Sequence, residues 1–273
     1  IVKDPVNLKV FEESHLVSIP SDGSSEERVN FTLPADAMEG SYTVQVGVYH
    51  GTEMVGFGSA FFEVASAFLR LNVKLPDVFI PNSINPISFD IENVGMAGVP
   101  EGQLTVRLYD PDKYIVWADT KGFTNLSTDS STTIGFSLLL EQIKFGNYRL
   151  EYTLLYGSKI MNGVTEIPCN VAMRLGFDKT SYRVREELSA TLELVNTGKF
   201  KQELKVVAEI PDCSFSEGRN TGLSPGEKTT INYSLTIPPI TGDGSHNVNI
   251  SLYLANSVLS ENYAFFIPSA KPE

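Results

Sequence analysis

The sequence predicts an all-β protein made of tandem immunoglobulin-like antiparallel β-sandwiches, of which the first is incomplete. Three observations predict this fold class. Short apolar segments recur along the 273 residues, apolar and polar residues alternate within them, and no segment keeps the apolar period of an amphipathic helix. Turn-forming residues separate the segments, as in antiparallel sandwiches. Parallel βαβ folds are excluded, because they need crossover helices.

The repeat becomes visible when the chain is aligned with itself. A strand-like segment occurs at Val29–Leu33, Ile134–Leu138 and Ile231–Leu235. A glycine at positions 40, 146 and 244 then opens a second segment in each copy. The spacing of the two landmarks agrees to within one residue, which indicates one building block used three times.

The segment after each glycine has the pattern of a half-buried strand. In the second copy, apolar residues at every second position from Tyr148 to Leu154 alternate with polar ones. A period of two with one apolar face is typical of antiparallel sheets. Each copy then ends in another apolar strand, such as Phe61–Val64 and Phe265–Ile267.

The second and third copies share an earlier strand that ends in Asn-x-Gly, at Ile91–Gly95 and Leu194–Gly198. Asn and Gly tolerate the left-handed backbone that a tight turn requires. The next strand of each copy leads into Pro-Asp, at positions 111 and 211.

The first copy lacks this earlier part, because Asp4–Pro5 aligns with Asp110–Pro111. Three explanations are open. The chain is a segment of a longer array, the first copy is a smaller sandwich with rearranged edges, or a strand from another subunit completes it by strand addition.

The copies predict three domains: a partial sandwich at 1–66 and complete sandwiches at 67–172 and 173–273. The linkers Val64–Phe68 and Val171–Met173 are short and contain no flexible Gly/Ser run. Neighbouring domains are therefore expected to keep their orientation, and the chain is expected to form a semi-rigid rod.

Composition narrows the classes of function. The apolar fraction of 42% is enough for buried cores, and the net charge is −12. An acidic chain without basic clusters repels phosphate, which argues against a nucleic-acid partner. No run of 18 apolar residues is present, so no transmembrane segment is predicted.

Cys169 and Cys213 are too few for a disulfide scaffold. We expect two thiols; a bridge between repeats, which would imply an oxidising compartment, is the alternative. Asn-x-Ser/Thr sequons support glycosylation only weakly, and they begin at Asn30, Asn125, Asn232 and Asn249.

No catalytic, cofactor-binding or metal-ligating residue is predicted. The histidines His15, His50 and His246 fall at different places in different copies, and there is no Cys-x-x-Cys motif. A catalytic triad or zinc site would need convergence across domains. The sequence therefore predicts a protein that is not an enzyme.

Calcium is the one cofactor that the sequence raises. Two groups of carboxylates lie in turns, where Asp is favoured for local hydrogen bonding in any case. A calcium ion needs six to eight converging oxygen ligands, so the structural reading is preferred. The groups are Asp110 with Asp112 and Asp119, and Asp22 with Glu26 and Glu27.

Three aromatic side chains have competing interpretations. Trp117, the single tryptophan, is a possible ligand platform that would stack on a sugar ring, although packing in an alternating strand is favoured. Tyr42 and Tyr148 open their strands, and we expect a tyrosine-corner role in which the hydroxyl bonds to nearby backbone.

The strand ending in Asn-x-Gly, followed by a Gly-x-Tyr strand, resembles prokaryotic immunoglobulin-like surface repeats of the CARDB type (cell-adhesion-related domains). Ile91–Gly95, Leu194–Gly198, Gly40–Tyr42 and Gly146–Tyr148 carry the resemblance, and His246 departs from it. Macroglobulin-type sandwiches are similar to a lesser degree. The resemblance implies extracellular spacers, stalks and adhesion modules, and it brings no catalytic residues.

The sequence therefore predicts a structural or adhesive segment of a larger cell-surface or extracellular protein. Its expected partners are other domains or subunits of the same surface assembly. A carbohydrate-binding accessory module of a secreted enzyme, with a glycan as partner, is one alternative. A subunit of a filament assembled by strand complementation is the other.

Overall fold

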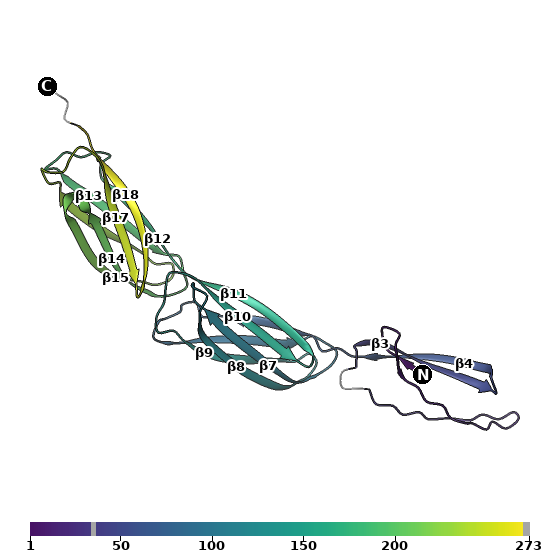
Figure 1. Cartoon of the computed structure of the whole chain (residues 1–273). Coiled ribbons are helices and arrows are strands. Elements are labelled where there is room, and N and C mark those ends of the chain that lie inside the picture. The colour runs from purple at the N-terminus through teal and green to yellow at the C-terminus, as the bar shows by residue number, and fades with distance from the viewer. Residues whose placement is uncertain (34–36, 270–273) are drawn as a thin grey trace.

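The computed structural model describes residues 1–33 and 37–269. Figure 1 shows two β-sandwiches and a smaller N-terminal unit arranged end to end. All paired strands are antiparallel, apart from one isolated parallel bridge between loops. In the described part of the chain the only helical element is the 3-10 turn η1 (Pro211–Cys213), and no helix is long and apolar enough to span a membrane.

The central sandwich packs a three-stranded sheet against a four-stranded one. The orders are β5-β6-β9 and β11-β10-β7-β8. Phe89 of the first sheet packs its ring 5.4 Å from that of Tyr152 of the second, inside a core of alternate side chains. The strands are β5 (Leu69–Lys74), β6 (Ile84–Asn93), β7 (Val99–Tyr109), β8 (Ile115–Leu126), β9 (Ser131–Leu139), β10 (Gly146–Tyr156) and β11 (Lys159–Cys169).

The C-terminal sandwich has the same topology, with orders β12-β13-β16 and β15-β14-β17-β18. The aligned segments Ile134–Leu138 and Ile231–Leu235 lie in β9 and β16, which hold equivalent places. This confirms the tandem sandwiches. The strands are β12 (Val171–Phe177), β13 (Glu187–Asn196), β14 (Gln202–Ile210), β15 (Phe215–Leu223), β16 (Lys228–Thr236), β17 (Gly244–Leu254) and β18 (Ser257–Ile267).

The N-terminal unit contains one sheet, of order β2-β1-β3-β4. This is the order of the larger sheet of each sandwich, and the pair Val2↔Val44 corresponds to Leu108↔Leu150. The first copy is thus incomplete, as predicted. Its strands are β1 (Val2–Lys3), β2 (Lys9–Phe11), β3 (Gly40–His50) and β4 (Glu53–Val64).

The prediction of a strand at Val29–Leu33 is wrong, because these residues pair with no other strand. In the central sandwich the aligned strand β9 pairs with β6, and the N-terminal unit has no counterpart of β6 among its described strands. Phe31 still packs over the sheet, with its ring 5.3 Å from Phe11 and 5.9 Å from Phe62. The segment keeps its packing and loses its hydrogen-bonded partner.

Candidate functional site

The junction between the two sandwiches is the most elaborately built site in the described structure. A loop before β6 pairs with the loop before β14: the Phe79 N–H donates to the Lys199 carbonyl (2.9 Å), and the Lys201 N–H donates to the Phe79 carbonyl (2.8 Å). The rings of Phe79 and Phe200 lie 5.2 Å apart, and both residues are 0% exposed. Two loops from different sandwiches therefore share backbone hydrogen bonds and an apolar core.

Tyr148 extends this core into the central sandwich. Its ring lies 5.0 Å from that of Phe200, and its hydroxyl accepts a hydrogen bond from the Lys144 N–H (2.8 Å). This is the tyrosine-corner role predicted for Tyr148. Burial raises the pKa of Tyr148 to about 12, so the hydroxyl stays neutral.

The Asn-x-Gly turn of the C-terminal sandwich holds the loop that carries Phe200. The fully buried Asn196 amide donates to the carbonyls of Phe200 (2.7 Å) and Leu223 (3.0 Å), and its oxygen accepts from the Gly198 N–H (2.9 Å). One side chain thus satisfies three buried backbone groups, which are costly to leave unpaired.

Gly198 then fixes the connecting chain. The Lys199 N–H donates to Pro168 (2.7 Å) and the Thr197 N–H to Asn170 (3.1 Å). A Cβ at Gly198 would lie 2.7 Å from the Pro168 oxygen, closer than real Cβ atoms come. Only glycine allows this approach of turn and linker.

The first junction repeats the arrangement. Asn93 donates to Ala97 (2.8 Å) and accepts from the Gly95 N–H (3.1 Å), and a Cβ at Gly95 would lie 2.2 Å from the Phe68 nitrogen. Lys159 adds an ion pair with Glu39 (2.7 Å). The Asn-x-Gly motif was predicted only as a turn. Its contact with the preceding linker was missed, and the recurrence of the motif at the end of the second strand after each linker was the available signal.

Polar contacts also join the β9–β10 loop of the central sandwich to the β17–β18 turn of the C-terminal one. The Phe145 N–H donates to the Ser257 hydroxyl (3.1 Å), and the Asn256 amide donates to Gln142 (3.1 Å). The C-terminal sandwich is therefore held to the central one at the Phe79 loop, along the linker and at the β17–β18 turn. Three separated contacts restrict bending in more than one direction.

Trp117 lies on β8 and is half-buried. Its ring packs edge-on against Phe136, at 6.0 Å and an interplanar angle of 89°. This is a usual aromatic packing geometry. A role as a ligand platform stays a prediction.

The first predicted carboxylate group is brought together around a lysine. The ammonium of Lys144 contacts Asp110 (2.7 Å) and Asp112 (2.5 Å). Burial of Asp110 opposes its ionisation, but hydrogen bonds from Lys144 and from backbone N–H groups outweigh it and lower its pKa. Asp119 instead accepts from the Thr120 N–H on β8.

The second group, Asp22 with Glu26 and Glu27, is exposed. Across residues 1–33 and 37–269, no set of three or more His, Cys, Asp or Glu side chains is placed to hold a metal ion. Calcium binding stays the less favoured of the two interpretations given in the sequence analysis.

The cysteines Cys169 and Cys213 are free and buried, one in each sandwich. The structure thus has the two expected thiols and contradicts the bridge. Burial raises the pKa of Cys169 to about 12, so its thiol is a poor nucleophile while the protein is folded.

The histidines are not brought together. His246 takes the place of Tyr148 in the C-terminal sandwich: its Nε2 lies 2.8 Å from the carbonyl oxygen of Gly242, four residues upstream, and its Nδ1 lies 2.8 Å from Asp212. It thus replaces the corner tyrosine by another polar ring. His15 and His50 are exposed in the N-terminal unit.

An exposed aromatic strip on the outer face of the β3–β4 hairpin was missed by the sequence analysis. Tyr49, Phe57 and Phe61 are 62–71% exposed. A Cβ at Gly47 would lie 2.9 Å from the Tyr49 ring, so this ring lies against the strand. Phe61 stands opposite Thr43, whereas the corresponding pair in the central sandwich is Arg149 and Glu166. This change from polar to aromatic was visible in the alignment of the copies.

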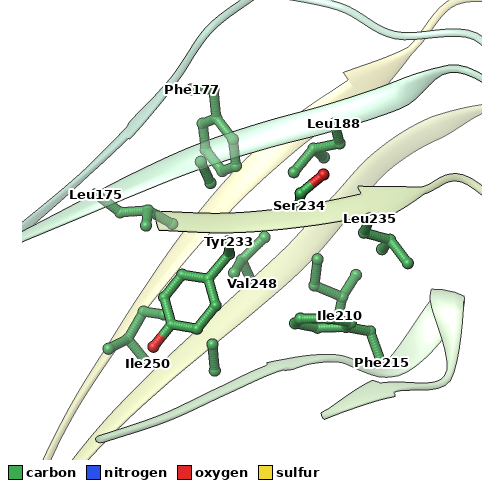
Figure 2. A pocket seen from close by; sticks show the side chains of 12 residues that line it. Leu175, Phe177, Leu188, Ile210, Phe215, Tyr233, Ser234, Leu235, Val248 and Ile250 are labelled. Carbon is green, nitrogen blue, oxygen red and sulfur yellow. The ribbon is translucent and has the colours of Figure 1, made fainter. Parts of the chain in front are cut away.

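Figure 2 shows a pocket between the two sheets of the C-terminal sandwich, lined mostly by apolar side chains such as Leu175, Val248 and Ile250. Its cavity of about 10 Å³ has room for about one water molecule. It is a packing defect of the core and is too small for an organic ligand.

No protein-family model matches the chain, and no curated protein matches it significantly. Solved structures match at low similarity. Red sea bream transglutaminase is 12% identical with a TM-score of 0.41, and the match covers 74% of this chain and 31% of the enzyme. Salmonella alpha-2-macroglobulin reacted with methylamine is 10% identical with a TM-score of 0.32, and the match covers 84% of this chain and 19% of that protein.

The CARDB domain of a Pyrococcus furiosus protein, solved in complex with di-metal ions, is 17% identical with a TM-score of 0.29. The match covers 37% of this chain and 92% of that domain. The solved structures thus include both families that the sequence resembles. The chain spans less than a third of the transglutaminase and less than a fifth of the macroglobulin.

Proposed function

We propose that this chain is a non-enzymatic structural segment of a larger cell-surface or extracellular protein, and that it acts as a semi-rigid stalk or assembly module. The observation that carries the proposal is the junction core of Phe79, Phe200 and Tyr148, in which loops of two sandwiches share backbone hydrogen bonds. A flexible tether does not need a packed junction between its domains. A spacer that holds its two ends at a fixed distance and orientation does need one.

The mechanism is mechanical. Each Asn-x-Gly turn contacts the linker that precedes it. This contact is expected to fix the orientation of each sandwich relative to the preceding domain. The same contact between an Asn-x-Gly turn and a linker occurs at both junctions, so both are expected to restrict the orientation of neighbouring domains. The domain limits 1–66, 67–172 and 173–273 remain part of this proposal. The predicted linker Val171–Met173 lies within β12, so Asn170 is the one residue between the last strand of the central sandwich and the first strand of the next.

Small-angle scattering tests the proposal on the intact chain. We expect one maximal dimension, close to that of the extended arrangement in Figure 1, which is insensitive to salt. The double variant Phe79→Ala with Phe200→Ala is expected to give a broader distribution of interatomic distances, while far-UV circular dichroism stays that of folded β-sheet. A wild-type distribution as broad as that of the variant would contradict a stalk.

Carbohydrate binding is a second candidate, and the aromatic strip of Tyr49, Phe57 and Phe61 favours it more than Trp117 does. Exposed ring faces stack on the C–H faces of sugars, and these three rings are far more exposed than the half-buried Trp117. A glycan array with the wild type, Phe57→Ala and Trp117→Ala separates the sites. Binding that only Phe57→Ala removes would assign it to the strip, and absence of binding would exclude this candidate.

A further inference from the structure

A groove lies on the outer face of the C-terminal sandwich, where β14 runs between β15 and β17 (Figure 1). Its volume of about 530 Å³ falls in the range of small-molecule sites, which is roughly 300–1,000 Å³. Ala255, at one end, belongs to the β17–β18 turn, whose Asn256 donates to Gln142 of the central sandwich (3.1 Å). The junction therefore holds one wall of the groove. The lining residues are Glu203, Leu204, Lys205, Asn220, Tyr253 and Ala255.

The strand register places three polar side chains of this groove in one row. Lys205 pairs with Asn220 of β15 on one side and with Tyr253 of β17 on the other. All three are exposed, Tyr253 to 39%. The nearby ion pair joins Lys201 to Glu203 (3.5 Å), and in the described part of the chain the three side chains of the row form no ion pair or hydrogen bond. An ammonium, an amide and a phenol are thus available to a ligand.

A glycine keeps the groove open beside this row. Gly222 of β15 pairs with Glu203 of β14. A Cβ at Gly222 would lie 3.0 Å from a carboxylate oxygen of Glu203, so this carboxylate lies over the glycine. A larger side chain at position 222 would have to displace the carboxylate. Glycine therefore makes room for an acceptor group at the wall of the groove.

Four positions around the groove differ in chemistry from the corresponding positions of the central sandwich. A tyrosine replaces a leucine, an ammonium replaces an amide, an amide replaces a glycine, and a glycine replaces a threonine. The central sandwich has the same topology without this set, so the shared fold does not require it. The strand pairings align Tyr253 with Leu155, Lys205 with Gln103, Asn220 with Gly122, and Gly222 with Thr124.

The lining favours a neutral ligand with many hydroxyl groups. The charges of Lys205 and Glu203 are opposite, so an ion of either sign meets one group that repels it. The polar side chains offer both hydrogen-bond donors and acceptors, and a hydroxyl group can bond to either kind. The Tyr253 ring has an apolar body and a polar tip, which suits the C–H face of a sugar ring.

We propose that this groove is a binding site for a neutral saccharide. Tyr253 supplies the stacking ring, and Lys205, Asn220 and Glu203 supply hydrogen-bonding groups. The site goes beyond the stalk function. It also lies in a different sandwich from Trp117 and away from the aromatic strip of the N-terminal unit.

Backbone amide chemical shifts of the intact chain test the site. The probes are the neutral disaccharides cellobiose, maltose, lactose and chitobiose, each at millimolar concentration. At least one of them is expected to shift the amides of residues 203–205, 220 and 253 until the site is saturated. The binding is expected to be unaffected by ionic strength, because these ligands carry no charge.

Variants of the chain assign the contacts. Tyr253→Ala is expected to weaken binding about 10-fold, whereas Tyr253→Phe keeps the ring and is expected to retain binding. Gly222→Thr introduces the side chain of the central sandwich and is expected to weaken binding by narrowing the groove. Tyr114→Ala, at an exposed tyrosine of the central sandwich, is the matched control and is expected to bind as the wild type does. Unchanged thermal unfolding shows that the variants are folded.

Four results would overturn the proposal. The first is the absence of shifts with all four disaccharides, and the second is equal binding by Tyr253→Ala and the wild type. The third is a set of shifts confined to Tyr49, Phe57 and Phe61, which would assign the sugar to the aromatic strip. The fourth is tighter, salt-sensitive binding of sialyllactose than of lactose, which would make the ligand acidic. None of them bears on the stalk function, because scattering measures that function without a ligand.

Discussion

The Phe79 ring lies 5.2 Å from the Phe200 ring, and both side chains are fully buried although each sits in a loop. Loops of single sandwiches are normally solvated. These two are buried because each covers the other, and the backbone hydrogen bonds on both sides of Phe200 keep them in register. The pair therefore joins the cores of two sandwiches into one continuous apolar cluster.

Phe79→Ala is expected to uncouple the sandwiches. The substitution removes a buried ring at a cost of about 3 kcal/mol, and this cost falls on the junction because Phe79 lies outside both sheets. ¹⁵N relaxation is expected to show two different rotational correlation times in place of a shared one. Ile80→Ala, at an exposed neighbour, is the control. Unchanged relaxation in Phe79→Ala would show that the ring does not hold the junction.

Gly198→Ala is expected to destabilise the linker contact by about 2 kcal/mol, because the new Cβ would overlap the Pro168 oxygen. Gly135→Ala is the matched control, since a Cβ there meets nothing within 4 Å. Urea unfolding followed by circular dichroism measures both. Equal stability of the two variants would contradict the close approach.

Asn196→Ala is expected to cost about 3 kcal/mol, because it leaves two buried carbonyls and one buried N–H without partners. Asn220→Ala, at an exposed position of β15, is expected to change the unfolding free energy by less than about 0.5 kcal/mol. The same urea titration compares them. A similar loss of unfolding free energy in both variants would contradict the role assigned to the buried Asn196 amide.

The strands and the repeat were predictable because a strand with one buried face alternates apolar and polar residues, and this pattern recurs in each copy. The strand at Val29–Leu33 was predicted wrongly for a related reason: alternation reports a buried face, whereas strand formation also needs a neighbour. Phe31 still packs on Phe62, so the pattern is accounted for without a ladder.

The junction could not be predicted in the same way. Other phenylalanines of the chain, such as Phe57 and Phe61, are exposed, so residue type alone does not mark Phe79 and Phe200 as a contact. The role of Gly198 depends on Pro168, far back in the chain and in another sandwich. His246 was regarded as a departure from the pattern, because sequence comparison does not show that an imidazole can bond to backbone at the place of the tyrosine, here to the carbonyl of Gly242 instead of an N–H group.

Acid is expected to weaken the turn around Lys144. The pKa of Asp110 is lowered in the folded state, so its ionisation stabilises the fold above the unfolded pKa, and this contribution is lost as pH falls through the folded value. Lys144→Met removes the partner. The loss of stability between about pH 5 and pH 2 should then be smaller in the variant than in the wild type. An identical pH profile would contradict this pairing.

Chelation is expected to leave thermal unfolding unchanged. The Lys144 ammonium already contacts both Asp110 and Asp112, so a divalent cation would have to displace it. Scanning calorimetry with EDTA and with added calcium provides the test. A rise in Tm with calcium that is reversed by EDTA would revive the calcium hypothesis.

Cys169 and Cys213 are expected to react with a thiol reagent only on unfolding. Both are buried, and burial raises the pKa of each thiol, so few thiolates form near neutral pH. The rate of reaction, measured against urea concentration, should follow the unfolding transition. Rapid labelling of the native chain would show that one thiol is open to solvent.

Residual dipolar couplings of backbone amides test the semi-rigid rod most directly. Couplings from residues 69–169 and 171–267 are measured together in one weakly aligned sample. The rigid junction predicts that one alignment tensor fits both sandwiches with the relative orientation of the structure. Two tensors of clearly different magnitude would mean that the sandwiches move independently, which contradicts a stalk built on the Phe79–Phe200 junction.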